Sequence, residues 1–257
     1  MKTVTLLKIP AGLSDDEHRR ASDRIVDERL DGLEVACRGS AYGPVWDPEI
    51  ECDLEFLRHY RCVSILRLDV KLRSLEALSA IAGTLTSLSL SNPPGKNRAI
   101  SLEPVANCPH LTSFSSAWPG LDLAPLTRLH GLEELSLTGG TQDRVAIFSA
   151  LPNLRSVGLG FGTVESLVGL EKLARVESFT ALRLRRLRDL RPLTNLRALR
   201  VVELDGLANV SSLPNLHDNE RLHTALSVTM NGLKDLDGLK GSAVRELAVI
   251  NSRVPPE

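Results

Sequence analysis

The glycine-rich stretch SVGLGFGTVES, residues 156–166, is the first candidate for chemistry. Gly158, Gly160 and Gly162 alternate behind apolar residues. A strand that runs into a glycine-rich turn begins many phosphate-binding loops, because glycine lets backbone N–H groups approach an anion closely. Here Val164 and Leu167 follow with the spacing of core residues. No helix N-terminus would therefore face the glycines, and the pattern argues against a phosphate loop.

The segment HDNERLH, residues 217–223, is the one candidate for metal binding. It brings acids, an amide and two histidines together within a short stretch. Irregular loops produce such clusters readily, and the other histidines are scattered without an H-E-x-x-H spacing. Neither a G-x-S-x-G elbow nor a Walker-type loop occurs in the sequence. We therefore expect no catalytic residue, no metal and no cofactor.

An arginine-rich segment, RLRRLRDLRPLTNLRALR (183–200), carries seven arginines and one acid, Asp189. Its apolar residues fall on core positions, so the arginines project outward. They could bind a carboxylate-rich partner or phosphates, or they could form a solvated face. Nucleic-acid binding favours interleaved aromatic residues and a basic net charge. The formal net charge is -1 and aromatic residues make up 4%, which makes nucleic acid an unlikely ligand.

The composition indicates a soluble protein. Hydrophobic residues make up 42% of the 257, and leucine alone occurs 47 times. The four cysteines form no C-x-x-C pair, which is typical of reduced thiols in the cytosol. The N-terminal apolar run is too short for a signal peptide, and no segment is long enough to span a membrane. These features predict a cytoplasmic protein with no membrane partner.

The leucines follow a repeat of the form L-x-x-L-x-L. We number Leu132 as position 1, so that Leu135 is position 4 and Leu137 is position 6. The steps between successive starts are 22, 26, 21, 22, 22, 20, 27 and 21 residues. The other eight units are Val63/Leu66/Leu68, Leu85/Leu88/Leu90, Leu111/Phe114/Ser116, Leu154/Val157/Leu159, Val176/Phe179/Ala181, Leu196/Leu199/Val201, His223/Leu226/Val228 and Val244/Leu247/Val249.

Each unit continues with apolar residues spaced by three, as in Val164, Leu167, Leu170 and Leu173. The period of two at positions 4 and 6 predicts a short strand whose two side chains face inward. The period of three that follows suits a 3₁₀ turn or a short helix that faces the same interior. One coil cannot bury its leucines alone, so the coils must stack and their strands pair in parallel.

The repeat resembles that of the leucine-rich repeat proteins, in the short 21–22-residue class of internalin-like and protein-phosphatase-regulator-like members. The resemblance covers residues 53–257 in about nine repeats. It implies a curved α/β solenoid with a parallel β-ribbon on its concave face and short helical or 3₁₀ turns on its convex face. The family prefers asparagine at position 9, where only Asn231 fits. The other turns must satisfy their backbone groups by different means.

The remaining segments are predicted to be ends and insertions. Residues 1–52 form an N-terminal cap and linker, with a strand in 3–9, a helix that starts at Ser14 and Glu17, and a strand in 33–37. Insertions at 91–101 and 215–223 map to loops of the array. The C-terminal coil has little chain left to cover it, which predicts a monomer or a weak dimer through that coil.

Two aromatic residues, Trp118 and Phe161, fall at position 8, on the edge of the concave face. Aromatic residues outside a core are enriched at interface hot spots, although both side chains could instead fold over the strand edge. Glycine and small hydroxyl side chains dominate position 5 and leave an open trough there. The predicted partner-binding residues are Trp118, Phe161, Arg67, Ser89, Ser115, Ser136, Gly158, Gly160, Thr180, Arg183, Arg200, Glu203 and Met230.

The resulting hypothesis is a non-enzymatic module that binds a protein partner on its concave face. A bacterial regulatory or immunity-type role is suggested by fold-level analogy. The alternative is the binding of an anionic ligand or RNA by the arginine-rich segment 183–200.

Overall fold

The computed structural model describes residues 4–10, 12–36, 51–91, 100–139 and 141–251. The chain divides into two compact units, Met1–Gly131 (unit 1) and Leu132–Glu257 (unit 2). Most of the predicted linker, the tip of the first insertion and the end of the last coil lie outside the described residues.

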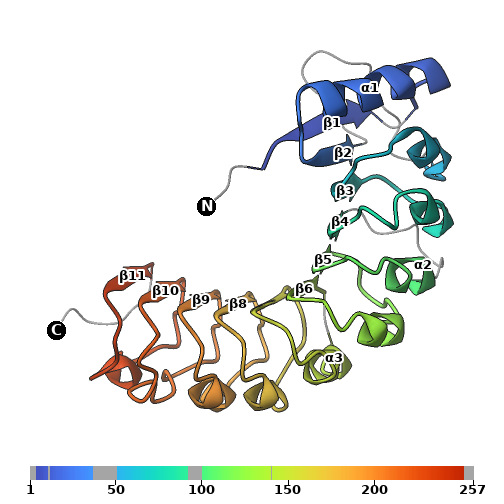
Figure 1. Ribbon diagram of the computed structural model, residues 1–257. Helices are drawn as coiled ribbons and strands as arrows, with labels where there is room; N and C mark the ends of the chain where they lie inside the picture. The colour runs from blue at the N-terminus through green and yellow to red at the C-terminus, as the bar shows by residue number, and fades with distance from the viewer. Residues whose placement is uncertain (1–3, 11, 37–50, 92–99, 140, 252–257) are drawn as a thin grey trace. The chain divides into compact units, whose positions relative to one another are not determined.

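Within its described residues, unit 1 contains five strands that pair in parallel and in chain order (Figure 1). Helical turns alternate with the strands along the chain. The strands are β1 (Leu6–Pro10), β2 (Gly32–Ala36), β3 (Ile65–Asp69), β4 (Ser87–Leu90) and β5 (Ser113–Ser116). The helices are α1 (Asp15–Asp27), α2 (Glu103–Ala106) and the 3₁₀ helices η1 (Glu55–His59), η2 (Glu76–Ala80) and η3 (Ala124–Arg128).

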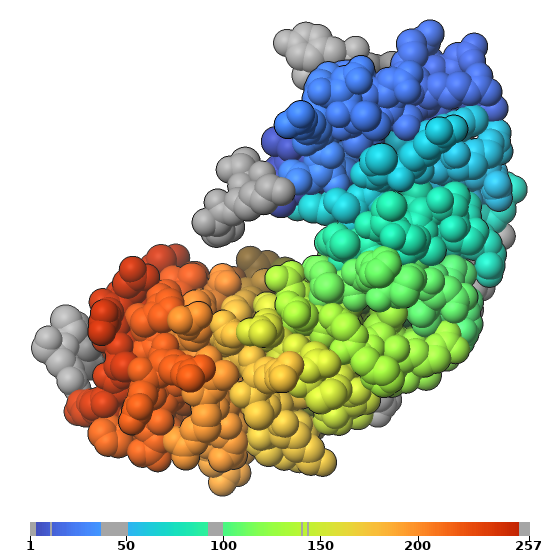
Figure 2. All heavy atoms as spheres, in the orientation of Figure 1, coloured from blue at the N-terminus to red at the C-terminus, as the bar shows by residue number. Residues whose placement is uncertain are grey.

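The described part of unit 2 contains six strands with the same parallel order, and its coils stack in chain order (Figure 2). The strands are β6 (Glu134–Thr138), β7 (Ser156–Gly160), β8 (Ser178–Leu182), β9 (Val201–Asp205), β10 (Thr224–Val228) and β11 (Glu246–Ile250). The turns hold helix α3 (Asp143–Ser149) and the 3₁₀ helices η4 (Leu170–Lys172), η5 (Arg191–Asn195) and η6 (Asp237–Leu239).

The inward side chains of both units form the expected leucine core. Leu66 and Leu68 of β3, and Leu135 and Leu137 of β6, are almost completely buried. The leucines spaced by three in the turns are buried in the same way, as Leu167 shows. The predicted α/β solenoid, with a parallel β-ribbon and short helical or 3₁₀ turns, is therefore confirmed.

The N-terminal segment contains a strand, a helix and a strand. Helix α1 begins with the expected capping box, because the Ser14 hydroxyl accepts from the Glu17 N–H and the Glu17 carboxylate accepts from the Ser14 N–H. Strands β1 and β2 pair with each other, and β2 pairs with β3 of the first repeat. The sheet of unit 1 thus runs through this segment without a change of direction. The domain boundary at residue 52 stays a prediction.

A repeated side-chain cap closes the turns that lack asparagine at position 9. In each case an Asp, Ser or Asn side chain accepts a hydrogen bond from the backbone N–H two residues later, at the start of the turn. Such caps satisfy backbone donors that a short helix leaves unpaired. The capping residues are Asp53, Ser74, Ser101, Asp122, Ser166, Asp189, Asn215 and Asp235.

The pairing register corrects two of the nine predicted repeats. Phe179 and Ala181 of β8 pair with Val202 and Leu204 of β9, so this unit reads Leu199/Val202/Leu204 and not Leu196/Leu199/Val201. The next unit reads Leu222/Ala225/Ser227 and not His223/Leu226/Val228. The error arose because leucines spaced by three run without a break from Leu184 to Leu199. Spacing alone cannot show where such a run passes from the turn into the strand.

Strand β10 places its larger apolar side chains on the outside. Its inward residues are Ala225 and Ser227, which are 5% and 4% exposed, whereas Leu226 and Val228 are partly exposed on the opposite face. The Ser227 hydroxyl has no hydrogen-bond partner among the described residues. It lies against a small apolar cavity that Leu193 and Leu239 also line. A one-residue slip would have put Leu226 and Val228 inside instead.

We expect Ser227→Val to raise the free energy of unfolding by about 1 kcal/mol. The change removes a buried hydroxyl without a partner and adds apolar volume beside the cavity. Chemical denaturation of the purified chain measures the difference. Ser227→Thr is the control, since it keeps the hydroxyl, and it should give less than half of the gain. A loss of stability with valine would contradict the β10 register.

Candidate functional site

The sheet of unit 2 has one face without helices or turns packed on it in Figure 1. We call this face the open face and define it by the side chains of positions 3, 5 and 7, which point away from the core. It is the surface that the sequence predicted as concave. Its residues are Glu134, Ser136, Thr138, Ser156, Gly158, Gly160, Ser178, Thr180, Leu182, Val201, Glu203, Asp205, Thr224, Leu226, Val228, Glu246, Ala248 and Ile250.

The chain leaves every strand of unit 2 through a residue with positive φ. This edge row consists of Gly139, Phe161, Arg183, Gly206, Thr229 and Asn251, with φ between 49° and 69°. Each of the first five donates its backbone N–H to a carbonyl of the next coil; the Phe161 N–H, for example, lies 2.8 Å from the Leu182 carbonyl oxygen. The left-handed conformation therefore extends the coil-to-coil hydrogen bonds one residue beyond the strands.

Phe161 combines exposure with backbone strain. Its side chain is 56% exposed and its φ is 52°. A left-handed residue that is not glycine costs about 1–2 kcal/mol, and a large side chain there is uncommon. The Arg183 guanidinium carbon lies 5.5 Å from the centre of the Phe161 ring, within the range of a cation–π contact. This pair is the largest aromatic feature at the edge of the open face.

Gly158 and Gly160 are covered by their neighbours. A Cβ atom at Gly158 would lie 2.5 Å from the Ser136 Oγ, and one at Gly160 would lie 3.3 Å from a Thr138 methyl group. Both glycines are buried. The glycines thus make room for side chains of β6, and the predicted open trough is partly filled by the chain itself at these positions.

Comparison with solved structures identifies the architecture. The chain aligns with an internalin (InlF) from Listeria monocytogenes at a TM-score of 0.50 and 18% identity, over 94% of this chain and 77% of that one. The functional domain of InlJ from the same organism aligns at a TM-score of 0.50 and 11% identity, over 98% of this chain and 64% of that one. Together with the parallel coils, these alignments settle the fold. The chain is a leucine-rich repeat solenoid.

A third internalin of that organism, InlC2, aligns at a TM-score of 0.43 and 18% identity, over 76% of this chain and 74% of that one. The sequence matches no protein-family model and no curated protein. The alignments with InlF and InlJ establish the leucine-rich repeat fold. At identities this low they do not show which partner the chain binds. Within the described residues, no helix is long and apolar enough to cross a membrane.

Trp118 does not lie on an exposed surface of this leucine-rich repeat array. Its side chain is 1% exposed, so the prediction that it is available to a partner is corrected. The preceding inward residue is Ser116, where most coils carry a larger apolar residue, and its hydroxyl accepts a hydrogen bond from the Trp118 N–H at 3.1 Å. Unlike Phe161, Trp118 does not have a positive φ, so the chain leaves its strand in a different conformation there.

Met230 is also buried, with 0% exposure. In the corrected register Thr229 occupies position 8 and Met230 occupies position 9, where the neighbouring coils place the buried Leu184 and Leu207. The same shift moves Asn231 to position 10, where it is exposed. Met230 therefore belongs to the core and not to the edge row.

The arginine-rich coil is largely paired with carboxylates of the chain itself. Arg186 contacts Glu165 at 3.0 Å, Arg191 contacts Asp189 at 2.7 Å, and Arg197 lies 3.7 Å from Asp218. Arg200, predicted at the site, precedes β9 and lies 3.4 Å from Glu177. Glu177 also contacts Arg155, which in turn approaches Glu133. These charges tie successive coils together on the surface.

The predicted residues of unit 1 lie on its own sheet. Arg67 of β3 is exposed, and it pairs in register with Glu34 on one side and Ser89 on the other. The Ser115 hydroxyl donates to the Ser89 hydroxyl at 2.9 Å. The remaining predicted residues, Ser136, Thr180, Arg183 and Glu203, lie in unit 2, on the open face or its edge row.

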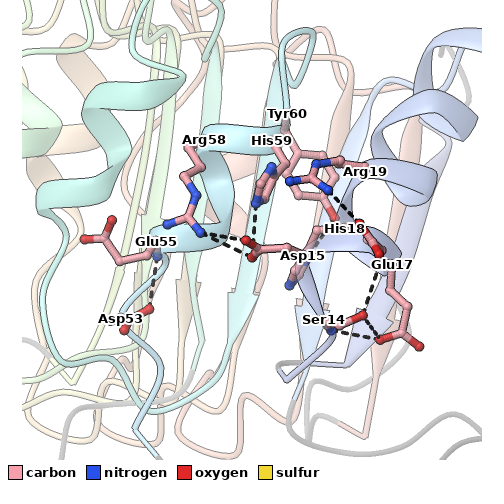
Figure 3. A network of polar contacts seen from close by, with 11 residues as sticks. Ser14, Asp15, Glu17, His18, Arg19, Asp53, Glu55, Arg58, His59 and Tyr60 are labelled. Atoms are coloured by element: carbon pink, nitrogen blue, oxygen red, sulfur yellow. Dashed lines mark hydrogen bonds and ion pairs between the residues drawn. The ribbon is translucent and has the colours of Figure 1, made fainter.

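A second polar cluster joins helix α1 to η1 in unit 1 (Figure 3). The buried His18 stacks on Phe56, with ring centres 4.4 Å apart, and its Nδ1 lies 3.0 Å from the Tyr60 hydroxyl. Asp15 lies 3.0 Å from Arg58 and 3.2 Å from His59. Burial lowers the pKa of His18 and raises that of Tyr60, while the contacts with His59 and Arg58 lower the pKa of Asp15. The contacts join α1 to η1, which indicates a structural role.

The amide of the candidate metal segment 217–223, which belongs to Asn219, has a structural role. Asn219 is buried, donates from Nδ2 to the Leu196 carbonyl at 2.9 Å and accepts from the Arg221 N–H. It therefore fixes the insertion to the preceding coil. Within the described residues, no group of three histidine, cysteine or acidic side chains is placed to hold a metal ion.

The predicted set leaves out several partly exposed residues of the open face, among them Leu182, Val201, Asp205, Leu226 and Val228. The register error assigned all of these except Leu182 to other positions. The signal that could have found them was the spacing Leu199, Val202, Leu204, which also fits L-x-x-L-x-L.

Glycine substitutions should separate backbone strain from packing in the edge row. We expect Thr229→Gly to raise the free energy of unfolding by about 0.5–1 kcal/mol, because it relieves a left-handed β-branched residue. Phe161→Gly should change it by less than about 1 kcal/mol, since strain relief offsets the lost contact with Arg183. Urea denaturation gives both values. A loss above about 2 kcal/mol for Phe161→Gly would mean that this ring is part of the packed structure.

The His18 cluster predicts acid sensitivity. The folded state disfavours protonation of His18. At pH values below about 6.5, the pKa of histidine in the unfolded chain, the unfolded chain therefore binds more protons than the folded one, and the free energy of unfolding decreases as the pH is lowered. The lowered pKa of Asp15 acts in the same direction at pH values below about 4. Thermal melts at pH 7.5 and 5.0 should show a lower Tm at pH 5.0. His18→Phe should reduce that difference, and an unchanged difference would exclude His18 as its cause.

Proposed function

We propose that this leucine-rich repeat chain is a non-enzymatic module that binds a protein partner on the open face of unit 2. The alignments with internalins support an interaction module in general terms. The open face supplies the specific surface, because six parallel strands present a continuous row of outward side chains with no helix packed on them.

The observation that carries this proposal is the state of Phe161. The chain holds a phenylalanine more than half exposed at an edge-row position where the preceding coil has Gly139 and the next has Arg183. The pairing between coils accounts for the left-handed backbone, which the whole edge row shares, but it does not call for an exposed phenyl ring. Exposed aromatic residues are enriched among interface hot spots, and burial against a partner would account for this ring.

The alternative, an anionic ligand or RNA bound by the coil 183–200, has weaker support. Arg186, Arg191, Arg197 and Arg200 face carboxylates of the chain, and Arg183 lies over Phe161. An added phosphate would have to compete with these contacts. Salt-dependent retention on heparin or RNA would favour the alternative.

Several finer features belong to the same proposal. A bacterial regulatory or immunity-type role and a cytoplasmic location remain predictions. A weak dimer would use β11, where the core positions Leu247 and Val249 are 48% and 37% exposed. Size measurements across a range of concentrations would test that dimer.

Site-specific photo-crosslinking tests the binding surface. A photoreactive phenylalanine analogue at position 161 should form an adduct with one protein in an extract of the source cells, because this residue would be buried by the partner. The matched control carries the analogue at Val168, which is 68% exposed and lies in the turn beside η4. We expect no adduct with the same protein from position 168.

Mass spectrometry of the adducts decides the outcome. A protein captured from position 161 and lost when an excess of unlabelled chain is added supports the proposal. Equal adducts from both positions, or adducts from position 168 alone, would place the interaction elsewhere. Adducts with RNA from position 161 would favour the alternative.

A further inference from the structure

We propose that the open face of unit 2 binds a protein segment in which one lysine or arginine is flanked by apolar side chains. The inference rests on the proposed function, which assigns a protein partner to this face, and it adds the chemistry of the bound segment. It depends on strands β8, β9 and β10 and on the register that pairs them.

The first argument is the inverted pattern of β10. This strand turns Leu226 and Val228 toward the open face and keeps the small residues Ala225 and Ser227 inside. The interior then holds a hydroxyl without a partner among the described residues and an apolar cavity. Local violations of core packing are expected where function requires them. An apolar partner surface against Leu226 and Val228 would account for this arrangement.

The second argument is a pair of carboxylates on the neighbouring strand. Glu203 and Asp205 are separated by one residue of β9, so both point to the open face, about 7 Å apart. Neither forms an ion pair within the described part of the chain, and Glu203 is contacted only by the Thr180 hydroxyl at 3.5 Å. The basic residues near the pair are engaged elsewhere. Arg200 is held by Glu177. Arg183, whose backbone N–H donates to the Asp205 carbonyl, has its guanidinium over the Phe161 ring. Two carboxylates at this spacing can share one guanidinium or ammonium group.

The register combines the two features into one surface. Glu203 lies between Thr180 and Leu226 on the adjacent strands, and Asp205 lies between Leu182 and Val228. The acidic pair is thus bordered by the apolar Leu226 and Val228 on β10 and by Thr180 and Leu182 on β8, at strand spacings of about 5 Å. A bound cation would be partly removed from water there, which strengthens its attraction to the carboxylates.

This chemistry selects one class of partner. The carboxylates would repel phosphates and acidic segments, and Leu182, Leu226 and Val228 would gain nothing from a purely polar cation. A protein segment with a lysine or arginine between apolar residues matches both parts of the surface. Charge complementarity of this kind sets partner choice and orientation at interfaces.

Selection from a random peptide library tests the proposal with the full chain as bait. A library of twelve-residue peptides displayed on phage would be selected on the immobilised protein, and the enriched peptides synthesised. We expect them to carry a lysine or arginine flanked by apolar residues. Replacement of that basic residue by glutamine should raise the Kd by about tenfold or more.

Two variants with matched controls locate the contacts. Glu203→Gln combined with Asp205→Asn should raise the Kd of the basic peptides about tenfold or more, while Asp23→Asn with Asp27→Asn, which removes two charges from α1 of unit 1, should leave it unchanged. Leu226→Ser should weaken binding, whereas Ser227→Val, on the inner face of the same strand, should not. Circular dichroism at the assay temperature checks that each variant is folded.

The outcomes distinguish this inference from the function on which it rests. Enriched peptides that are acidic or neutral, yet lose binding in Leu226→Ser, would overturn the inference and leave the open face as a binding surface. Basic peptides that bind the carboxylate double variant equally well would also overturn it. Failure to enrich any peptide above an unrelated bait counts against the inference, whereas the crosslinking experiment tests the proposed function separately.

Discussion

The parallel pairing of one coil with the next is the constraint on which the rest of the structure depends. A strand of four or five residues has two inward positions, and each can be buried only if the neighbouring strand pairs in the same register. The hydrogen bonds of the edge row extend this pairing past the strand and require a left-handed residue after each strand of unit 2. Once register and exit are fixed, the positions of the core and of the open face follow.

Most of the fold could be predicted from the sequence, because the spacing of the leucines follows the register in which neighbouring strands pair. The capping box at Ser14 and the leucines of positions 4 and 6 gave the strand and turn order of both units. The prediction failed where the spacing is degenerate, in the unbroken series from Leu184 to Leu199, and where β10 contradicts its own pattern. In β10 the polar Ser227 faces the core and the apolar Leu226 faces outward, the opposite of what their hydrophobicity suggests. Only the pairing with the adjacent strands decides between the two registers.

The candidate site was predictable only in part. Phe161 could be singled out as an aromatic residue off the core positions, but Trp118 satisfied the same criterion and is buried. What separates them is the backbone after the strand, which is left-handed at Phe161 and not at Trp118, and a repeat pattern does not register this difference. Likewise, the arginines of segment 183–200 suggest a free basic surface until their partners on adjacent coils, such as Glu165 and Glu177, are known. Pairing between coils is a long-range property that no short motif encodes.

The turn caps have a consequence for how such an array can change in length. Each capping side chain accepts a hydrogen bond from the N–H two residues later in the same coil, as Asp122 does from Ala124 and Asp235 does from Asp237. These caps are therefore internal to each coil, although other side chains such as Asn219 bridge to the neighbouring coil. Gain or loss of a whole coil would leave every remaining cap intact, and the strand pairing, core contacts and side-chain bridges at the junction would have to re-form. Binding surfaces of different widths could thus arise from the same turn chemistry.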